Sequence, residues 1–215
     1  MKRTLILLFC LFQILDFTFG QSIDSLKTKA SKEFAIELTA IQTSLLSKNF
    51  YGINYNIKYF PTKRFGTGAY IIFSPKRISD TFTYSIKKPI IQFYEIGWTN
   101  QYNFLQTNRV RMNISLVNGF SQVRLGDNAI KEKRHKYAPK EISSNYFYTL
   151  EPGSSFSYKL ISSKDNADFW LTAEANYRFV FGDTKYGMTK DFSGYLFGIG
   201  ISIIGFVDDK AYPKK

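Results

Sequence analysis

The sequence has one cysteine, one histidine and, beyond its first twenty residues, no long hydrophobic run. Cys10 lies close to the N-terminus, so the chain after residue 20 can form no disulfide and must be stabilised by burial and hydrogen bonds. No later apolar stretch approaches the ~20 residues that a membrane-spanning helix requires, which excludes a helical membrane bundle. Metal-ligand clusters, phosphate-binding loops and nucleophile elbows are also missing. The sequence therefore predicts no metal, no cofactor and no catalytic site.

The first twenty residues are typical of a cleaved secretory signal. Lys2 and Arg3 form a basic start, residues 4–15 an apolar core, and residues 18–20 a small-x-small exit. Phe9 precedes Cys10, whereas a lipoprotein would carry a small residue there, so we expect no lipidation. The predicted organisation is a signal peptide (1–20), a polar periplasmic tail (21–32), a folded domain (33–207) and a C-terminal tail (208–215).

The chain is strongly basic, with a formal net charge of +12. Loss of Lys2, Arg3 and Asp16 with the signal leaves about +11. A basic surface attracts phosphates, either of nucleic acid or of lipid headgroups. Because the chain carries a secretory signal, we expect lipid headgroups and no nucleic acid.

Aromatic residues are abundant, at 18% of the chain, and many alternate with polar or small residues. Aromatic side chains favour strands, and a two-residue period indicates a strand between two different environments. Eight such segments follow one another: 33–46, 51–60, 65–74, 90–104, 110–116, 146–160, 169–181 and 195–207. Segment 33–46 also fits a helix, but we favour a strand because the pattern that follows it is repetitive.

The connections between these segments alternate in length. Short breaks at residues 61–64, 106–108 and 163–166 alternate with longer polar connections at 75–88, 126–145 and 182–193. Outer-membrane barrels have short periplasmic turns, longer outer loops and an even number of strands. The sequence thus predicts an all-β, closed, antiparallel up-and-down transmembrane β-barrel of eight strands, with the longer connections outside.

The chain resembles the small eight-stranded outer-membrane β-barrel proteins of Gram-negative bacteria. The resemblance covers residues 33–207 and rests on the signal peptide, the strand spacing, and the hairpins YGINYNIKYF…RFGTGAYIIF and ANYRFVF…GYLFGIGISIIGF. It implies a porin-like barrel domain in the cell outer membrane and brings no catalytic signature. Barrels of this class often end on an aromatic residue, whereas here VDDKAYPKK follows Phe206, so Phe206 or Tyr212 would take that place.

Charged residues fall on the inward face of the predicted strands. The predicted interior network contains four acids and four bases: Glu37, Lys58, Glu95, Arg111, Glu151, Lys159, Glu174 and Arg178. A charge-selective pore would carry a surplus of one sign, and eight strands leave room only for side chains. We therefore expect a plug of paired charges, with Glu37 facing Lys58 (Thr43 opposite Gly52) and Glu151 facing Arg178 (Ser162 opposite Ala167).

Two further features concern the surface. Basic residues collect in the outer loops and could meet outer-membrane lipid, including lipopolysaccharide phosphates: Lys76, Arg77, Lys87, Lys88, Lys131, Lys133, Arg134, Lys136 and Lys140. Ordinary solubility explains them equally well. Two aromatic belts at the membrane interfaces are expected from Trp98 and the aromatics near Tyr51, Tyr195, Phe60, Phe65, Phe104 and Phe169.

The predicted function is structural or surface-interactive: envelope integrity, adhesion or docking of an envelope partner. A soluble lipocalin-like barrel that binds a small apolar ligand is the main alternative, and it would turn its aromatic face inward. A lipid-modifying enzyme would need His135 held beside a serine such as Ser143 or Ser144. A long polar loop between charged neighbours is a poor place for such catalysis.

Overall fold

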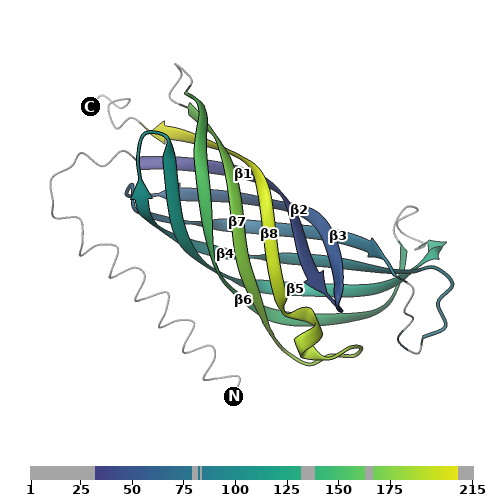
Figure 1. The fold of residues 1–215 in the computed structure, drawn as a ribbon. Coiled ribbons are helices and arrows are strands. Elements are labelled where there is room, and N and C mark those ends of the chain that lie inside the picture. Colours follow the sequence, from purple (N-terminus) through teal and green to yellow (C-terminus); the bar gives the residue numbers. More distant parts are fainter. Residues whose placement is uncertain (1–31, 79–81, 83, 132–138, 163–166, 208–215) are drawn as a thin grey trace, which may run out of the picture. The chain divides into compact units, whose positions relative to one another are not determined.

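A computed structural model describes residues 32–78, 82, 84–131, 139–162 and 167–207. These residues form one closed antiparallel barrel in which consecutive strands are neighbours (Figure 1). The strands are β1 (Lys32–Leu45), β2 (Lys48–Phe60), β3 (Phe65–Arg77), β4 (Pro89–Gln106), β5 (Val110–Lys131), β6 (Pro139–Ser162), β7 (Ala167–Phe181) and β8 (Gly194–Val207).

The first strand closes the barrel because it pairs on both sides. Leu38 of β1 faces Tyr55 of β2 and Ile201 of β8. The predicted all-β, up-and-down, eight-stranded architecture is confirmed, and segment 33–46 is a strand, not a helix. We call the end with the short connections 61–64 and 107–109 the turn end, and the opposite end the loop end.

Side chains alternate between the outer and inner faces of the barrel. Along β1 every second residue from Phe34 to Leu38 is an exposed apolar side chain, and the residues between them are buried. The exposed large apolar residues on the other strands include Ile53, Ile57, Ile71, Ile96, Ile114, Phe156, Leu171, Phe179, Phe197, Ile199 and Ile201. So large an apolar surface on every strand is suited to contact with lipid.

The aromatic belts follow the prediction with one correction. Tyr51 and Tyr195 are exposed toward the loop end, and Phe104 and Phe169 are exposed toward the turn end. Phe60, however, is only 1% exposed. The two-residue period of β2 turns it inward, where it packs with Ala35, Trp170 and Ile204.

Several strands are longer than predicted at the loop end. β3 continues to Arg77, inside the predicted 75–88 connection, and β5 and β6 take up residues 126–131 and 139–145 of the predicted 126–145 loop. These extensions pair with each other, and β5 also pairs with β4 as far as Asp127. The sequence did not predict these extensions because they lack the alternating apolar residues of the membrane-facing strands. They are held together by backbone hydrogen bonds between the strands.

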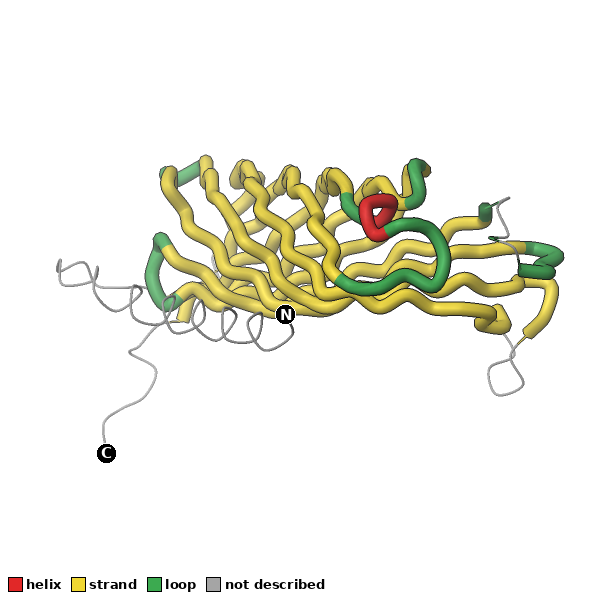
Figure 2. Tube along the Cα trace, turned by 90° about the horizontal axis from the view of Figure 1, so that it is seen from below, coloured by secondary structure: helices red, strands yellow, loops and turns green. Residues whose placement is uncertain are grey.

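The loop end also contains a short helical turn. The 3-10 helix η1 (Thr189–Phe192) lies in the β7–β8 connection, and longer strands continue past it (Figure 2). No helix among the described residues is long and apolar enough to cross a membrane. Phe192 of η1 is buried inside the barrel, so the β7–β8 connection helps to close the loop end.

Candidate functional site in the barrel interior and at its loop end

The interior near the turn end is built around Arg111. Its Nη2 lies 2.9 Å from Glu33 Oε2, and its guanidinium lies 5.4 Å from the Phe60 ring and 5.2 Å from the Trp170 ring. Beside it, Lys159 Nζ pairs with Asp168 Oδ2 at 2.5 Å. Aromatic faces and carboxylates together accommodate these cations in a site shielded from water.

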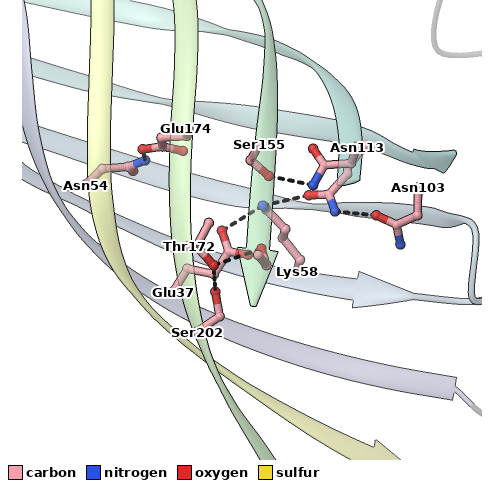
Figure 3. Close-up of polar contacts among 11 residues, drawn as sticks. Glu37, Asn54, Lys58, Asn103, Asn113, Ser155, Thr172, Glu174 and Ser202 are labelled. Atoms are coloured by element: carbon pink, nitrogen blue, oxygen red, sulfur yellow. Dashed lines mark hydrogen bonds and ion pairs between the residues drawn. The ribbon is translucent and has the colours of Figure 1, made fainter. Parts of the chain in front are cut away.

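The middle of the barrel is organised around Lys58, which reaches from β2 toward β1 and β4 (Figure 3). Its ammonium donates hydrogen bonds to Glu37 Oε2 at 2.7 Å and to Gln101 Oε1 at 2.8 Å. Hydroxyl and amide pairs continue the network around the wall, with Asn113 bonded to Ser155 and Thr172 to Ser202. Most of these bonds join neighbouring strands along the wall, and the bond from Lys58 to Gln101 passes over β3 to join β2 to β4.

Toward the loop end, Arg178 binds two carboxylates. Its Nε lies 2.5 Å from Glu151 Oε1 and 3.0 Å from Glu95 Oε2. Glu95 Oε1 also accepts hydrogen bonds from the hydroxyls of Tyr70 at 2.5 Å and Thr149 at 2.9 Å. One cation is therefore shared by two buried acids from different strands.

Both predicted ion pairs, Glu37–Lys58 and Glu151–Arg178, are present in the structure, but only the second has the predicted strand register. In the first hairpin the proposed register is wrong by two residues: Thr43 faces Phe50, and Glu37 faces Asn56. Glu37 still reaches Lys58, the next inward residue on β2, because diagonal neighbours lie within reach of long side chains. Between β6 and β7 a register shift near Lys159 restores the proposed alignment around Glu151.

The predicted balance of interior charges is wrong. Glu33 and Asp168 also point inward, so the interior network contains six acids, five of them in ion pairs, and four bases. The two-residue period could have revealed both acids, since Glu33 is in phase with Glu37 and Asp168 with Thr172. Glu33 is the first residue of its predicted segment, and Asp168 lies just before the predicted segment 169–181, so neither was assigned to the inner face.

The interior at the loop end is apolar, which the sequence did not predict. Its buried cluster includes Leu45, Phe50, Ile72, Ile91, Phe93, Val123, Leu125, Phe147, Val180, Tyr186, Phe192 and Leu196. A plug made only of paired charges is therefore incomplete. Runs such as YIIF and PIIQF, apolar on both faces, were the available signal.

The β7–β8 connection folds over this apolar cluster. The Tyr186 hydroxyl donates to the carbonyl of Val123 at 2.6 Å, and the Phe192 ring lies 4.9 Å from that of Phe147. Asn145 joins the connection to the β6 edge, since its amide donates to the Tyr186 carbonyl and accepts from the Lys185 N–H. Side chains thus close the loop end.

A hollow of about 500 Å³ lies outside this cap and is bordered by basic residues. Arg77, Lys87 and Lys88 surround it, and Ile78, Ile86, Pro89 and Asn128 complete its lining. Asp127 fixes its edge by accepting hydrogen bonds from the backbone N–H groups of Lys87 and Lys88, each at 3.0 Å. These bonds, led by that from Lys87, outweigh desolvation and lower the pKa of the Asp127 carboxyl.

Of the other predicted basic residues, Lys76 does not line this hollow. Lys76 bonds instead to the Asn49 carbonyl and lies over the Phe50 ring. Lys131 lies at the end of β5. Lys133, Arg134 and Lys136 lie outside the described residues, as does His135.

Ser143 and Ser144, the serines considered for catalysis, are buried in β6, where Ser144 donates a hydrogen bond to Glu141 at 2.5 Å. Within the described ranges, no three His, Cys, Asp or Glu side chains form a group that could hold a metal ion. A lipocalin would turn its aromatic face inward, whereas here the belt aromatics Tyr51, Tyr195, Phe104 and Phe169 are exposed on the outer face.

The chain is similar to known proteins in its three-dimensional structure. No protein-family model and no curated protein sequence matches the chain. Neisserial surface protein A is similar in fold, with 11% identity over 82% of this chain and 97% of that chain and a TM-score of 0.53. Ail of Yersinia pestis (11% identity, 82% and 99% covered, TM-score 0.47) and OprG of Pseudomonas aeruginosa (10%, 83% and 98%, 0.47) are also similar.

The closed barrel with its apolar outer face has the fold of the small eight-stranded outer-membrane β-barrel proteins. The chain is an integral protein of the outer membrane.

Proposed function

We propose that the protein is a closed, non-enzymatic barrel whose loop end faces outward and docks anionic components of the envelope. The filled interior is the observation that carries this proposal. Ion pairs occupy the lumen from Arg111 to Arg178, and the apolar cluster with Phe192 occupies the loop end. The cavity between the charge clusters measures about 20 Å³, room for about one water molecule.

The closed lumen favours a structural or surface role over transport. A solute path would need continuous space, whereas the buried Arg178 and Phe192 obstruct the lumen at successive levels. Both side chains are held by neighbours, Arg178 by two carboxylates and Phe192 by the Phe147 ring. Opening a path would require breaking these contacts together.

The basic hollow supports docking of a phosphate-bearing partner. Three exposed cationic side chains surround it, and Ile78, Ile86 and Pro89 line it with apolar surface. Such a combination suits an amphipathic phosphate, with ammonium and guanidinium groups on the anion and apolar surface beneath the acyl or sugar part. Lipopolysaccharide phosphates have this chemistry at the outer leaflet.

Planar-bilayer recordings test the closed lumen. Purified protein should show no steady conductance, and neither should the Met188→Ala variant, whose altered side chain is exposed. Phe192→Ala, which removes a buried ring of the cap, should still leave the Arg178 cluster as a barrier. A stable, ion-selective open channel in the unaltered protein would refute the closed barrel.

Native mass spectrometry with lipid A tests the docking. Lys87→Gln/Lys88→Gln should weaken binding of bis-phosphorylated lipid A, while folding is preserved because the hydrogen bonds to Asp127 come from the backbone N–H groups of these lysines. Lys140→Gln/Lys190→Gln removes the same charge from exposed positions outside the hollow and is the matched control. Equal losses in the two double variants would show general charge attraction and contradict a specific site.

A further inference from the structure

The small cavity in the middle of the barrel lies between the Lys58 and Arg178 clusters. Its lining includes Glu151, Glu174, Asn54, Asn56 and Lys58. Its volume of about 20 Å³ holds one particle of the size of a water molecule. The residues around it carry an unbalanced charge.

Four acids and two bases lie in the cavity wall or directly behind it. Lys58, Glu151 and Glu174 line the cavity, and Glu37, Glu95 and Arg178 each contact a lining residue. Lys58 is paired with Glu37, and its ammonium also donates to Gln101. Arg178 is shared between Glu95 and Glu151. Glu174 forms no ion pair with another described residue, and it accepts a 3.2 Å hydrogen bond from the Asn54 amide nitrogen. Two carboxyl groups therefore have no cation of their own among the described residues, and two of the four acids, Glu151 and Glu174, line the cavity.

Two amide oxygens in the cavity wall also lack a donor. Asn54 and Asn56 are 6% and 5% exposed, and the Oδ1 atom of each is buried and accepts no hydrogen bond from any described residue. Buried oxygens without a partner are costly. They therefore point to a bound particle that attracts oxygen lone pairs.

Gly198 creates the space that Glu174 needs to reach this point. A Cβ at residue 198 would lie 2.6 Å from Glu174 Oε1 and 2.6 Å from Thr39 Cγ2. The Glu174 side chain thus extends from β7 across β8 and β1 to Asn54 on β2 (Figure 3). A larger residue at 198 would displace the carboxylate.

We propose that this cavity binds one hard, oxygen-liganded cation between Glu174 and the side-chain oxygens of Asn54 and Asn56. Hard cations such as Na⁺ and Ca²⁺ take carboxylate and amide oxygens as ligands, and Ca²⁺–oxygen distances are about 2.3–2.6 Å. The cation neutralises surplus charge that the four interior bases leave, and it supplies the partner that both amide oxygens need. This site is independent of docking at the basic hollow.

Thermal unfolding tests the site. The full chain is refolded into detergent micelles and unfolded in NaCl, CaCl₂ or choline chloride at equal ionic strength. The inorganic cation that binds should raise the apparent melting temperature over choline by roughly 4 °C at about ten times its dissociation constant. The NaCl and CaCl₂ arms identify the ion. Glu174→Gln and Asn56→Ala should each abolish or reduce the shift, whereas Glu141→Gln, in an ion pair at the loop end, should retain it.

The role of Asn56 separates cation binding from simple protonation of the surplus acids. A protonated Glu174 would not depend on the Asn56 oxygen, so a shift that survives Asn56→Ala would overturn the proposal. Equal melting temperatures in all three salts would also overturn it. Heat-modifiable gel mobility, which reports the folded barrel, shows whether each variant folds before its salt dependence is compared.

Discussion

The guanidinium of Arg178 lies 4.3 Å from the centre of the Phe93 ring, at the boundary between the two halves of the lumen. On one side Arg178 meets the carboxylates of Glu95 and Glu151, and on the other Phe93 belongs to the apolar cluster. A single stacked pair therefore joins the polar interior to the apolar cap. The stability of the whole barrel should depend strongly on this contact.

Removal of the shared cation should be more damaging than removal of either acid. Arg178→Met leaves Glu95 and Glu151 buried without a cation, which should cost about 3–5 kcal/mol of unfolding free energy. Glu151→Gln should cost less, because Arg178 keeps Glu95. Denaturant unfolding in micelles measures both, and Glu141→Gln, in a partly exposed pair, should cost only about 0–1 kcal/mol.

The double variant Glu151→Gln/Arg178→Met should not be rescued. From the sequence alone, Arg178→Met is expected to relieve the cation left by Glu151→Gln. The structure contradicts this expectation because Arg178 also pairs with Glu95. In the double variant Glu95 stays buried without a cation. Recovery of wild-type stability would show that Glu95 is not charged beside Arg178.

The apolar outer face should not tolerate a charge. Ile201 is 50% exposed on β8, between Gly200 and the inward Ser202. Ile201→Arg should reduce the folding free energy in lipid by about 2–4 kcal/mol if this position lies at the bilayer midplane. Ser202→Thr, on the other face, should do little. Folding titrations in phospholipid vesicles measure both, and equal effects would contradict lipid contact at Ile201.

Low pH should weaken the hydrogen bonds between Asp127 and the backbone of Lys87 and Lys88, which hold the edge of the basic hollow. The hydrogen bond from Lys87, aided by Ala129 and Lys88, lowers the pKa of Asp127. The folded state therefore favours the ionised carboxylate, whose contribution is complete above the ordinary Asp pKa of about 3.9 and is lost as pH falls through the lowered value. Hydrogen exchange of the Lys87 and Lys88 amides, corrected for intrinsic rates, should show protection at pH 7 that disappears in acid. Asp127→Asn should lower protection at pH 7 and remove its acid dependence; unchanged protection would refute this role.

The cap should depend on its buried ring. Phe192 is fully buried against Phe147 and Tyr186, so Phe192→Ala should cost about 3–5 kcal/mol. Met188, in the same connection, is exposed, and Met188→Ala should be nearly neutral. Trypsin cleavage at Lys185 and Lys190 should accelerate only in the first variant. Similar cleavage of both would mean that the connection does not depend on the packing of Phe192.

The sequence predicted the barrel because alternation is a local property of each strand. Phe34, Ile36 and Leu38 show the outer face of β1 without reference to any other strand. The first hairpin register was wrong because its turn carries no recognisable signal. Leu46 and Ser47 both have positive φ, 54° and 57°, in a two-residue turn that usually carries Asn-Gly.

Contacts across the lumen could not be predicted in the same way. Arg178 reaches Glu95 from β7 to β4, and this contact depends on barrel closure and on side-chain length. Tyr70 reaches Glu95 across space that Gly97 and Gly119 leave open, since a Cβ on either would lie under 3 Å from the Tyr70 side chain. Such arrangements require all eight strands in place.

Spin-label scanning along β8 tests the membrane barrel most directly. The chain after residue 20 lacks cysteine, so single cysteines from Tyr195 to Ile203 can be labelled without interference. In lipid vesicles, labels at Phe197, Ile199 and Ile201 should be accessible to oxygen dissolved in lipid, and labels at Leu196 and Ser202 should be shielded from it. A two-residue alternation of this phase is the predicted result. Access of a water-soluble nickel reagent to the first set, or no alternation, would contradict the account.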